Sequence, residues 1–227
     1  MERSSSERKT QEIRGRGIGE IMKALHNDEN IAEATFNKTI TVAQLKAFAD
    51  ALSTNQSVTK LYIGYPAGDE GAIILAEALK KNNTVTQLLL GSSGIGDEGA
   101  KAIAKTLKVN SSISNLDLGI NAIGNEGAQS LAEALKVNQT LADLNLHYNK
   151  VGDRGAKALA EAVQVNETLD GLNLYENAIG DDGARALYEA AKINQKILKV
   201  YLGANTTSMS LEEEISSSDQ SHRIRIQ

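Results

Sequence analysis

Apolar residues recur along this chain with a period of about 28 residues, and each period combines two hydrophobic spacings. The first is the nine-residue pattern L-x-x-L-x-L-x-x-N, whose alternation predicts a strand with one buried face. Four copies are complete: residues 113–121 (ISNLDLGIN), 141–149 (LADLNLHYN), 169–177 (LDGLNLYEN) and 197–205 (ILKVYLGAN). Three weaker copies precede them, at residues 31–39, 58–66 and 85–93.

A helical spacing follows the strand pattern in the four copies from residue 85 to residue 177. The connecting turns read IGDEGA, IGNEGA, VGDRGA and IGDDGA. In one of the segments that follow, Ala128, Leu131, Ala132 and Leu135 are spaced i, i+3, i+4 and i+7, which places them on one face of a helix. Neither a short strand nor a single helix can bury its apolar face alone, so the repeats must stack on one another.

The seven copies resemble the ribonuclease-inhibitor type of leucine-rich repeat over about residues 31–205. This resemblance implies an α/β leucine-rich repeat solenoid, a curved and right-handed stack of βα repeats. Its parallel sheet is expected on the concave side and its helices on the convex side.

Both ends of the chain depart from the repeat. Helical spacing of apolar residues predicts an N-terminal capping helix at residues 16–27, so the repeat domain is expected over residues 16–205 after a disordered tail at 1–15. The C-terminal tail, residues 206–227, is rich in serine and charge. Ser210 and Glu213 have the spacing of a capping box and predict a short helix that covers the last strand; disorder is the alternative.

Recurring glycines and asparagines are interpreted as structural. We expect Gly96 and its counterparts to need a positive φ or a close approach, Gly99 and its counterparts to allow tight packing of helix on strand, and the Asp or Asn between them to cap a helix. The asparagines that end the strand pattern are expected to bond loop backbone in a ladder: Asn121, Asn149, Asn177 and Asn205. Five further asparagines in Asn-x-Ser/Thr sites share one repeated turn, so they are interpreted as repeat punctuation and not as glycosylation acceptors: Asn55, Asn82, Asn110, Asn138 and Asn166.

The stretch GSSGIGDEGAK (91–101) allows another interpretation. A strand, a glycine-rich turn and a helix start can bind a pyrophosphate, and with YEAAK (188–192) the stretch resembles the cofactor turn and Tyr-x-x-x-Lys of short-chain dehydrogenases. Its turn, however, recurs in three later repeats, and the acidic residues at the helix starts would repel a phosphate. We therefore expect a protein that is not an enzyme and has no catalytic residue, cofactor or metal.

Composition narrows the classes of partner. The chain has 24 Lys and Arg against 29 Asp and Glu, interspersed, with a formal net charge of −5, so we expect neither a nucleic acid nor a membrane as partner. Without cysteine there is neither a disulfide nor a thiolate metal site. No signal peptide is apparent and no segment approaches the roughly 20 apolar residues of a membrane span, so a cytoplasmic monomer is expected.

The candidate binding residues lie between the inward-facing leucines, where alternation along a strand directs side chains to the concave side. Five of the six tyrosines fall there, and tyrosine is favoured in protein interfaces. The predicted protein-binding residues are Tyr62, Tyr65, Asp117, Asp143, Asn145, His147, Tyr148, Asn173, Tyr175 and Tyr201.

The first functional hypothesis is a non-catalytic module that binds a partner protein through its concave face and loop rim. An alternative comes from ITVAQLKAFADALSTNQSVTKLYI (40–63), which is similar to the start of the leucine-rich domain of tropomodulins. That resemblance covers about residues 28–90 and implies binding to actin or the cytoskeleton. As a second alternative, a family that accelerates GTP hydrolysis by Ran uses similar 28-residue repeats, although its long acidic C-terminal stretch is absent here.

Overall fold

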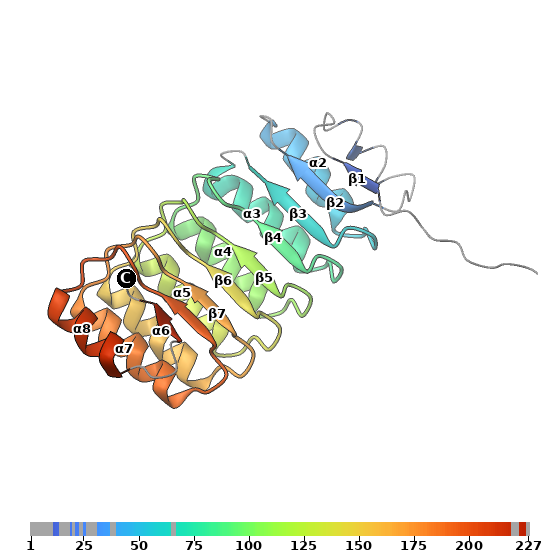
Figure 1. The fold of residues 1–227 in the computed structure, drawn as a ribbon. Helices are drawn as coiled ribbons and strands as arrows, with labels where there is room; N and C mark the ends of the chain where they lie inside the picture. Colours follow the sequence, from blue (N-terminus) through green and yellow to red (C-terminus); the bar gives the residue numbers. More distant parts are fainter. Residues whose placement is uncertain are drawn as a thin grey trace, which may run out of the picture.

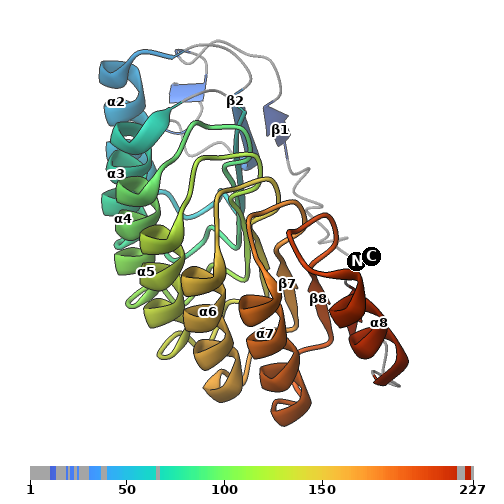
Figure 2. The same cartoon turned by 90° about the vertical axis from the view of Figure 1, so that its left-hand side faces the viewer.

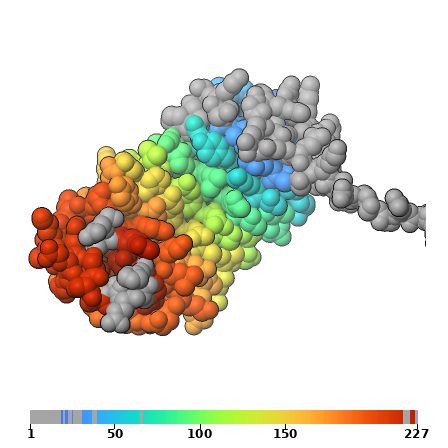
Figure 3. All heavy atoms as spheres, viewed as in Figure 1, coloured from blue at the N-terminus to red at the C-terminus, as the bar shows by residue number. Residues whose placement is uncertain are grey.

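The computed structural model describes residues 11–13, 19, 21, 22, 25, 31–36, 40–64, 67–218 and 223–225. Over these residues, one parallel sheet runs from β1 to β9 in sequence order. Figure 1 shows the strands side by side with the helices in a second layer, and Figure 2 shows that the two layers follow one curve. In Figure 3 the successive repeats form adjacent bands of one continuous surface.

The elements alternate strand and helix. The strands are β1 (Gln11–Ile13), β2 (Ile31–Phe36), β3 (Lys60–Ile63), β4 (Gln87–Leu89), β5 (Asn115–Asp117), β6 (Asp143–Asn145), β7 (Gly171–Asn173), β8 (Lys199–Tyr201) and β9 (Ile224–Arg225). The helices are α2 (Val42–Leu52), α3 (Gly68–Leu79), α4 (Asp97–Leu107), α5 (Asn125–Leu135), α6 (Asp153–Val165), α7 (Asp181–Ile193) and α8 (Met209–Ser218).

The core is a set of aligned apolar columns between the two layers. Leu116 is in register with Leu144, and Leu144 with Leu172, so equivalent leucines lie side by side. Helix residues such as Leu131 and Ala128 cover them and are fully buried. The predicted α/β leucine-rich repeat solenoid, with leucines inward and the intervening residues outward, is confirmed.

At the N-terminal end, β1 pairs in parallel with β2. It lies within residues 1–15, where the sequence predicts no structure, and it is held there by the hydrogen-bonding edge that β2 offers. Of the expected capping helix at 16–27, only residues 19, 21, 22 and 25 are described; they have helical backbone, and Ile21 and Leu25 are buried.

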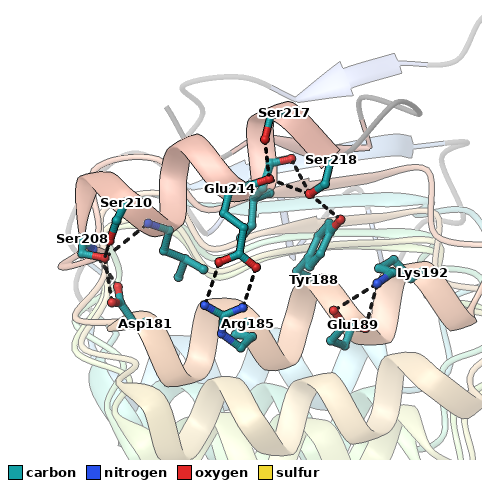
Figure 4. A network of polar contacts seen from close by, with 12 residues as sticks. Asp181, Arg185, Tyr188, Glu189, Lys192, Ser208, Ser210, Glu214, Ser217 and Ser218 are labelled. Atoms are coloured by element: carbon teal, nitrogen blue, oxygen red, sulfur yellow. Dashed lines mark hydrogen bonds and ion pairs between the residues drawn. The ribbon is translucent and has the colours of Figure 1, made fainter.

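At the C-terminal end, α8 packs against α7 and buries Leu211 and Ile215. Figure 4 shows the polar contacts between the two helices. Arg185 donates to both carboxylate oxygens of Glu214, at 2.7 and 3.0 Å, and Tyr188 is 2.8 Å from the hydroxyl of Ser218.

The residue that caps α8 differs from the expected one. Ser208 accepts a hydrogen bond from the backbone N–H of Leu211 at 3.3 Å, whereas Ser210 already lies inside the helix, which begins at Met209. Ser208 is itself held by Asp181, whose carboxylate accepts from its backbone N–H and its hydroxyl. The cap thus joins α8 to the start of α7.

Two asparagine ladders connect successive repeats. In the expected one, Asn121 donates to the carbonyl oxygens of Leu90 and Leu118 at 3.0 and 2.9 Å, and its side-chain oxygen accepts from two backbone N–H groups of the preceding turn. In the other, Asn110 donates to the carbonyl oxygens of Leu79 and Asn82 at 2.8 and 2.9 Å. Asn110 is buried, which agrees with a structural role for the Asn-x-Ser/Thr turns.

The aspartates at the helix starts act differently from the expectation. Asp97 does not cap α4, whose N-cap is Gly96 with an ordinary φ of −103°. Its Oδ1 accepts instead from the N–H groups of Gly124 and Gly127 in the next repeat, at 2.7 and 2.8 Å. The same pair of bonds to the following repeat is made by Asp69, Asn125 and Asp153. Each therefore caps the next helix, and the aspartates also compensate its positive dipole end.

Close approach to this carboxylate explains both glycine series. A Cβ at residue 124 would lie 3.2 Å from Oδ2 of Asp97, and one at residue 127 would lie 2.7 Å from Oδ1 and 3.0 Å from Cβ of Ala100. Positive φ is therefore not the reason for Gly96, Gly124 and their counterparts, which have ordinary negative φ. Gly99, Gly127 and their counterparts were expected to pack against a strand. Gly127 instead packs against the preceding helix, next to Asp97 and Ala100.

Replacing Asp97 with alanine should destabilise the fold by about 1–3 kcal/mol, because two N–H groups at the start of α5 lose their acceptor. Asp97→Asn should recover most of the loss, since Asn125 makes the same two bonds to Gly152 and Gly155. Urea unfolding followed by circular dichroism measures both, with exposed Glu98→Ala as the control. Equal stability of Asp97→Ala and the wild type would contradict the assignment.

The contact between α7 and α8 should weaken in acid. Hydrogen bonding and charge attraction from Arg185 hold the pKa of Glu214 below its usual 4.5, so the contact contributes stability above that pH and loses it as pH falls through the lowered value. Glu214→Gln should therefore lower the Tm slightly at pH 7, and this difference should shrink as the pH falls through the lowered pKa of Glu214. Glu213→Gln, on the exposed neighbour, is the control; a Tm difference that persists in acid would refute this account.

Candidate protein-binding face

The open face of the sheet carries the residues that alternate with the buried leucines. One column runs from Asp117 through Asn145 and Asn173 to Tyr201, and each of these residues is in register with the next. Asp143 begins β6, two positions before Asn145, on the same face. The structure therefore brings five of the predicted residues together on β5 to β8.

Three of these five also shape the turns that follow their strands. Oδ1 of Asp117 accepts from the backbone N–H of Gly119 at 2.8 Å. Oδ1 of Asn173 accepts from the N–H of Tyr175 at 3.0 Å. Asn145 makes the equivalent bond to the N–H of His147 and also lies 2.8 Å from Nδ1 of that ring. These side chains fix where the next side chain starts, so they position the turn as well as line the face.

An aromatic cluster lies on the turns after β6 and β7. The ring centroids of His147 and Tyr148 are 5.6 Å apart and nearly perpendicular, and those of Tyr148 and Tyr175 are 6.1 Å apart. Tyr148 is 47% exposed and Tyr175 40% exposed. His147 folds across Gly119, where a side chain would collide with its ring. We refer to His147, Tyr148 and Tyr175 as the aromatic cluster.

One residue within each of these turns has a left-handed backbone. In the column of Tyr148 (φ 51°), Ile120 has a φ of 56° and Glu176 a φ of 54°, a conformation that costs non-glycine residues free energy, β-branched ones above all. Ile120 is 52% exposed. A hydrogen bond and like charge from Glu176 raise the pKa of the Tyr148 phenol.

Ile120 and Glu176 are therefore part of the rim, although the sequence analysis did not select them. The signal that could have found them is their position, because each stands 28 residues from Tyr148 in the same column of the repeat. Neither residue type suggests an interface by itself.

The other tyrosines that the structure describes do not join the aromatic cluster. Tyr62 folds over Gly64 on β3, Tyr201 is on β8, and Tyr65 lies outside the described residues. Tyr188, which suggested a dehydrogenase motif, is buried, bonds to Ser218 and has the ammonium of Lys192 5.1 Å above its ring. Its position is that of a packing residue between α7 and α8.

A hollow of about 270 Å³ interrupts the face between β6 and β8. Its polar lining comes from Asp143, Asn145, Asn173, Lys199 and Tyr201, around Gly171. Across the described part of the chain, no group of three or more acidic, histidine or cysteine residues is arranged to hold a metal ion. Nor is any helix among those described both long and apolar enough to cross a membrane.

Comparison with known proteins agrees with this architecture. Four segments, residues 81–104, 109–132, 137–160 and 165–187, match a family model described as "Leucine Rich repeat". The repeats are leucine-rich repeats, as the sequence predicts. No curated protein matches the chain.

Similar solved structures include leiomodin-1 actin-binding site 2, with a TM-score of 0.49 and 20% identity, covering 80% of this chain and 91% of that one. Another is the C-terminal domain of tropomodulin from Caenorhabditis elegans, with a TM-score of 0.48 and 13% identity, covering 79% and 94%. The second comes from the family that residues 40–63 resemble. At these identities and TM-scores, neither likeness transfers a function to this chain.

Proposed function

We propose that this protein is a non-catalytic protein–protein interaction module that binds its partner through the concave face and the rim of turns after β5 to β7. The aromatic cluster is the observation that carries the proposal. Its three rings come from two consecutive repeats, and two of them are 40% or more exposed. Tyrosines exposed side by side offer a large apolar area and two hydroxyls to a partner.

Preorganisation strengthens this interpretation. His147 is held by Asn145 and lies across Gly119, and the N–H of Tyr175 is held by Asn173. Side chains whose positions are already fixed lose little conformational entropy when a partner binds, so more of the contact free energy remains as affinity. Clusters of this kind are typical centres of protein interfaces.

The triple variant His147→Ala, Tyr148→Ala, Tyr175→Ala should keep the fold and lose the partner. The three side chains are on the open face and not in the core, so the Tm should change little, while capture of the partner should fall at least about tenfold. Affinity capture from a lysate of the source, followed by mass spectrometry, identifies the partner and measures the loss.

A matched control removes apolar surface elsewhere. Val109, Val137 and Val165 are 58–65% exposed at the C-terminal ends of α4, α5 and α6, away from the turns of the cluster. Changing these three valines to alanine should leave capture unchanged. Capture that survives the triple variant, or that is lost equally in the valine control, would refute the concave site.

Actin is the second candidate partner, because residues 40–63 resemble the start of the leucine-rich domain of tropomodulins. If the protein acts as that resemblance implies, it should slow elongation at actin filament pointed ends in a pyrene-actin assay. The valine variant should behave as the wild type does. Unchanged elongation at saturating protein would remove actin and leave the interaction module in place.

A further inference from the structure

The hollow exists because one side chain is missing from a column of the open face. In the column that starts each strand, β3 to β6 carry Lys60, Gln87, Asn115 and Asp143, and β8 carries Lys199. At the same register, β7 has Gly171. The backbones of the two neighbouring residues, Asp143 and Lys199, are thus two strand spacings apart, about 10 Å, and the Asp143 carboxylate reaches over the glycine from one side.

One wall of the hollow offers a free carboxylate oxygen. Oδ2 of Asp143 accepts from the side-chain amide of Asn115 at 2.9 Å. Oδ1 has no partner among the described residues and lies over Gly171, where a side chain would collide with it. A cation that entered the hollow would complete the hydrogen bonding of this carboxylate.

Charge around this wall favours a cation. Residues 113–121, 141–149 and 169–177 contain no lysine or arginine, and their acids are Asp117, Asp143, Asp170 and Glu176. The aromatic cluster is on the same two repeats, and the faces of tyrosine rings attract cations. Lys199 forms the opposite wall and would turn a cationic group towards Asp143.

We infer that the hollow above Gly171 is the anchor site for an arginine or lysine side chain of the partner protein. This inference rests on the proposed function and names the partner chemistry. The partner contributes a basic, extended segment along β6 and β7. Gly171 begins β7 and Tyr175 lies in the turn two residues after its end, at most about 13 Å away along an extended chain, so a single segment reaches both the hollow and the aromatic cluster.

The test uses a random peptide library displayed on phage, selected on the full chain. Selected peptides should be enriched in arginine or lysine, and their affinity, measured by fluorescence anisotropy, should fall as salt rises. Enrichment of acidic or uncharged peptides, or no enrichment, would overturn the inference.

Variants locate the site. Gly171→Gln fills the hollow with a side chain that Gln87 already carries at the equivalent position of β4. Its Cβ meets only the carboxylate of exposed Asp143, which can rotate aside, so the fold should tolerate it. It should weaken the recovered peptides at least about tenfold, and Asp143→Asn should do the same by removing the charge. Lys199→Gln should tighten binding, because it removes a repulsive charge.

Two further variants separate this inference from the proposed function. Gln87→Gly opens a comparable gap away from the acidic wall and should not weaken the peptides. If the triple variant of the aromatic cluster loses the peptides while Gly171→Gln keeps them, the concave interface stands and the anchor site is overturned. If neither variant affects them, both are overturned.

Discussion

The structure depends on polar side chains that each repeat extends into the repeat before it. Asn138 donates to the carbonyl oxygens of Leu107 and Asn110, and Asn149 to that of Leu118. Asn138 is buried, and a buried polar group that loses its partner costs about 1–3 kcal/mol. Each repeat therefore has one favourable position relative to its neighbour. Apolar contacts alone would allow a strand or helix to slide along equivalent leucines; the asparagine bonds do not.

This fixed register is what makes an exposed column possible. Tyr148 and Tyr175 are 27 residues apart in sequence, and their rings are neighbours only because β6 and β7 keep the same register through the following turns. The ladder leaves those two positions free, since it occupies Asn149 and Asn177. Residues that hold the scaffold and residues that can recognise a partner are thus interleaved along the chain, and the second set can vary while the first is kept.

The periodic pattern was sufficient to predict strands β2 to β8 and helices α4 to α7, but not β1 or β9, which lie in the predicted tails. It was not sufficient for contacts between repeats. Asp97 looks like a cap for its own helix when only the local sequence is considered, because its true partners, Gly124 and Gly127, are 27 and 30 residues away. Similarly, the hollow is produced by a side chain that is absent, and a search for reactive or aromatic residue types passes over a glycine.

Charge divides the open face into parts with different possible roles. At one end Lys60 lies 3.4 Å from Glu33, so the two charges largely compensate each other. At the other end Lys199 and Arg225 stand on the last two strands. Between them, β5 to β7 combine acidic side chains and the aromatic cluster without a basic residue in the strand segments. A partner that approaches this face meets an attractive region for cations bordered by a basic edge, which favours one direction of approach and one alignment along the sheet. The absence of a side chain at Gly171 has two effects. It leaves space beside Asp143 for a group of the partner, and it leaves Lys199 without a side-chain neighbour at the same register on β7.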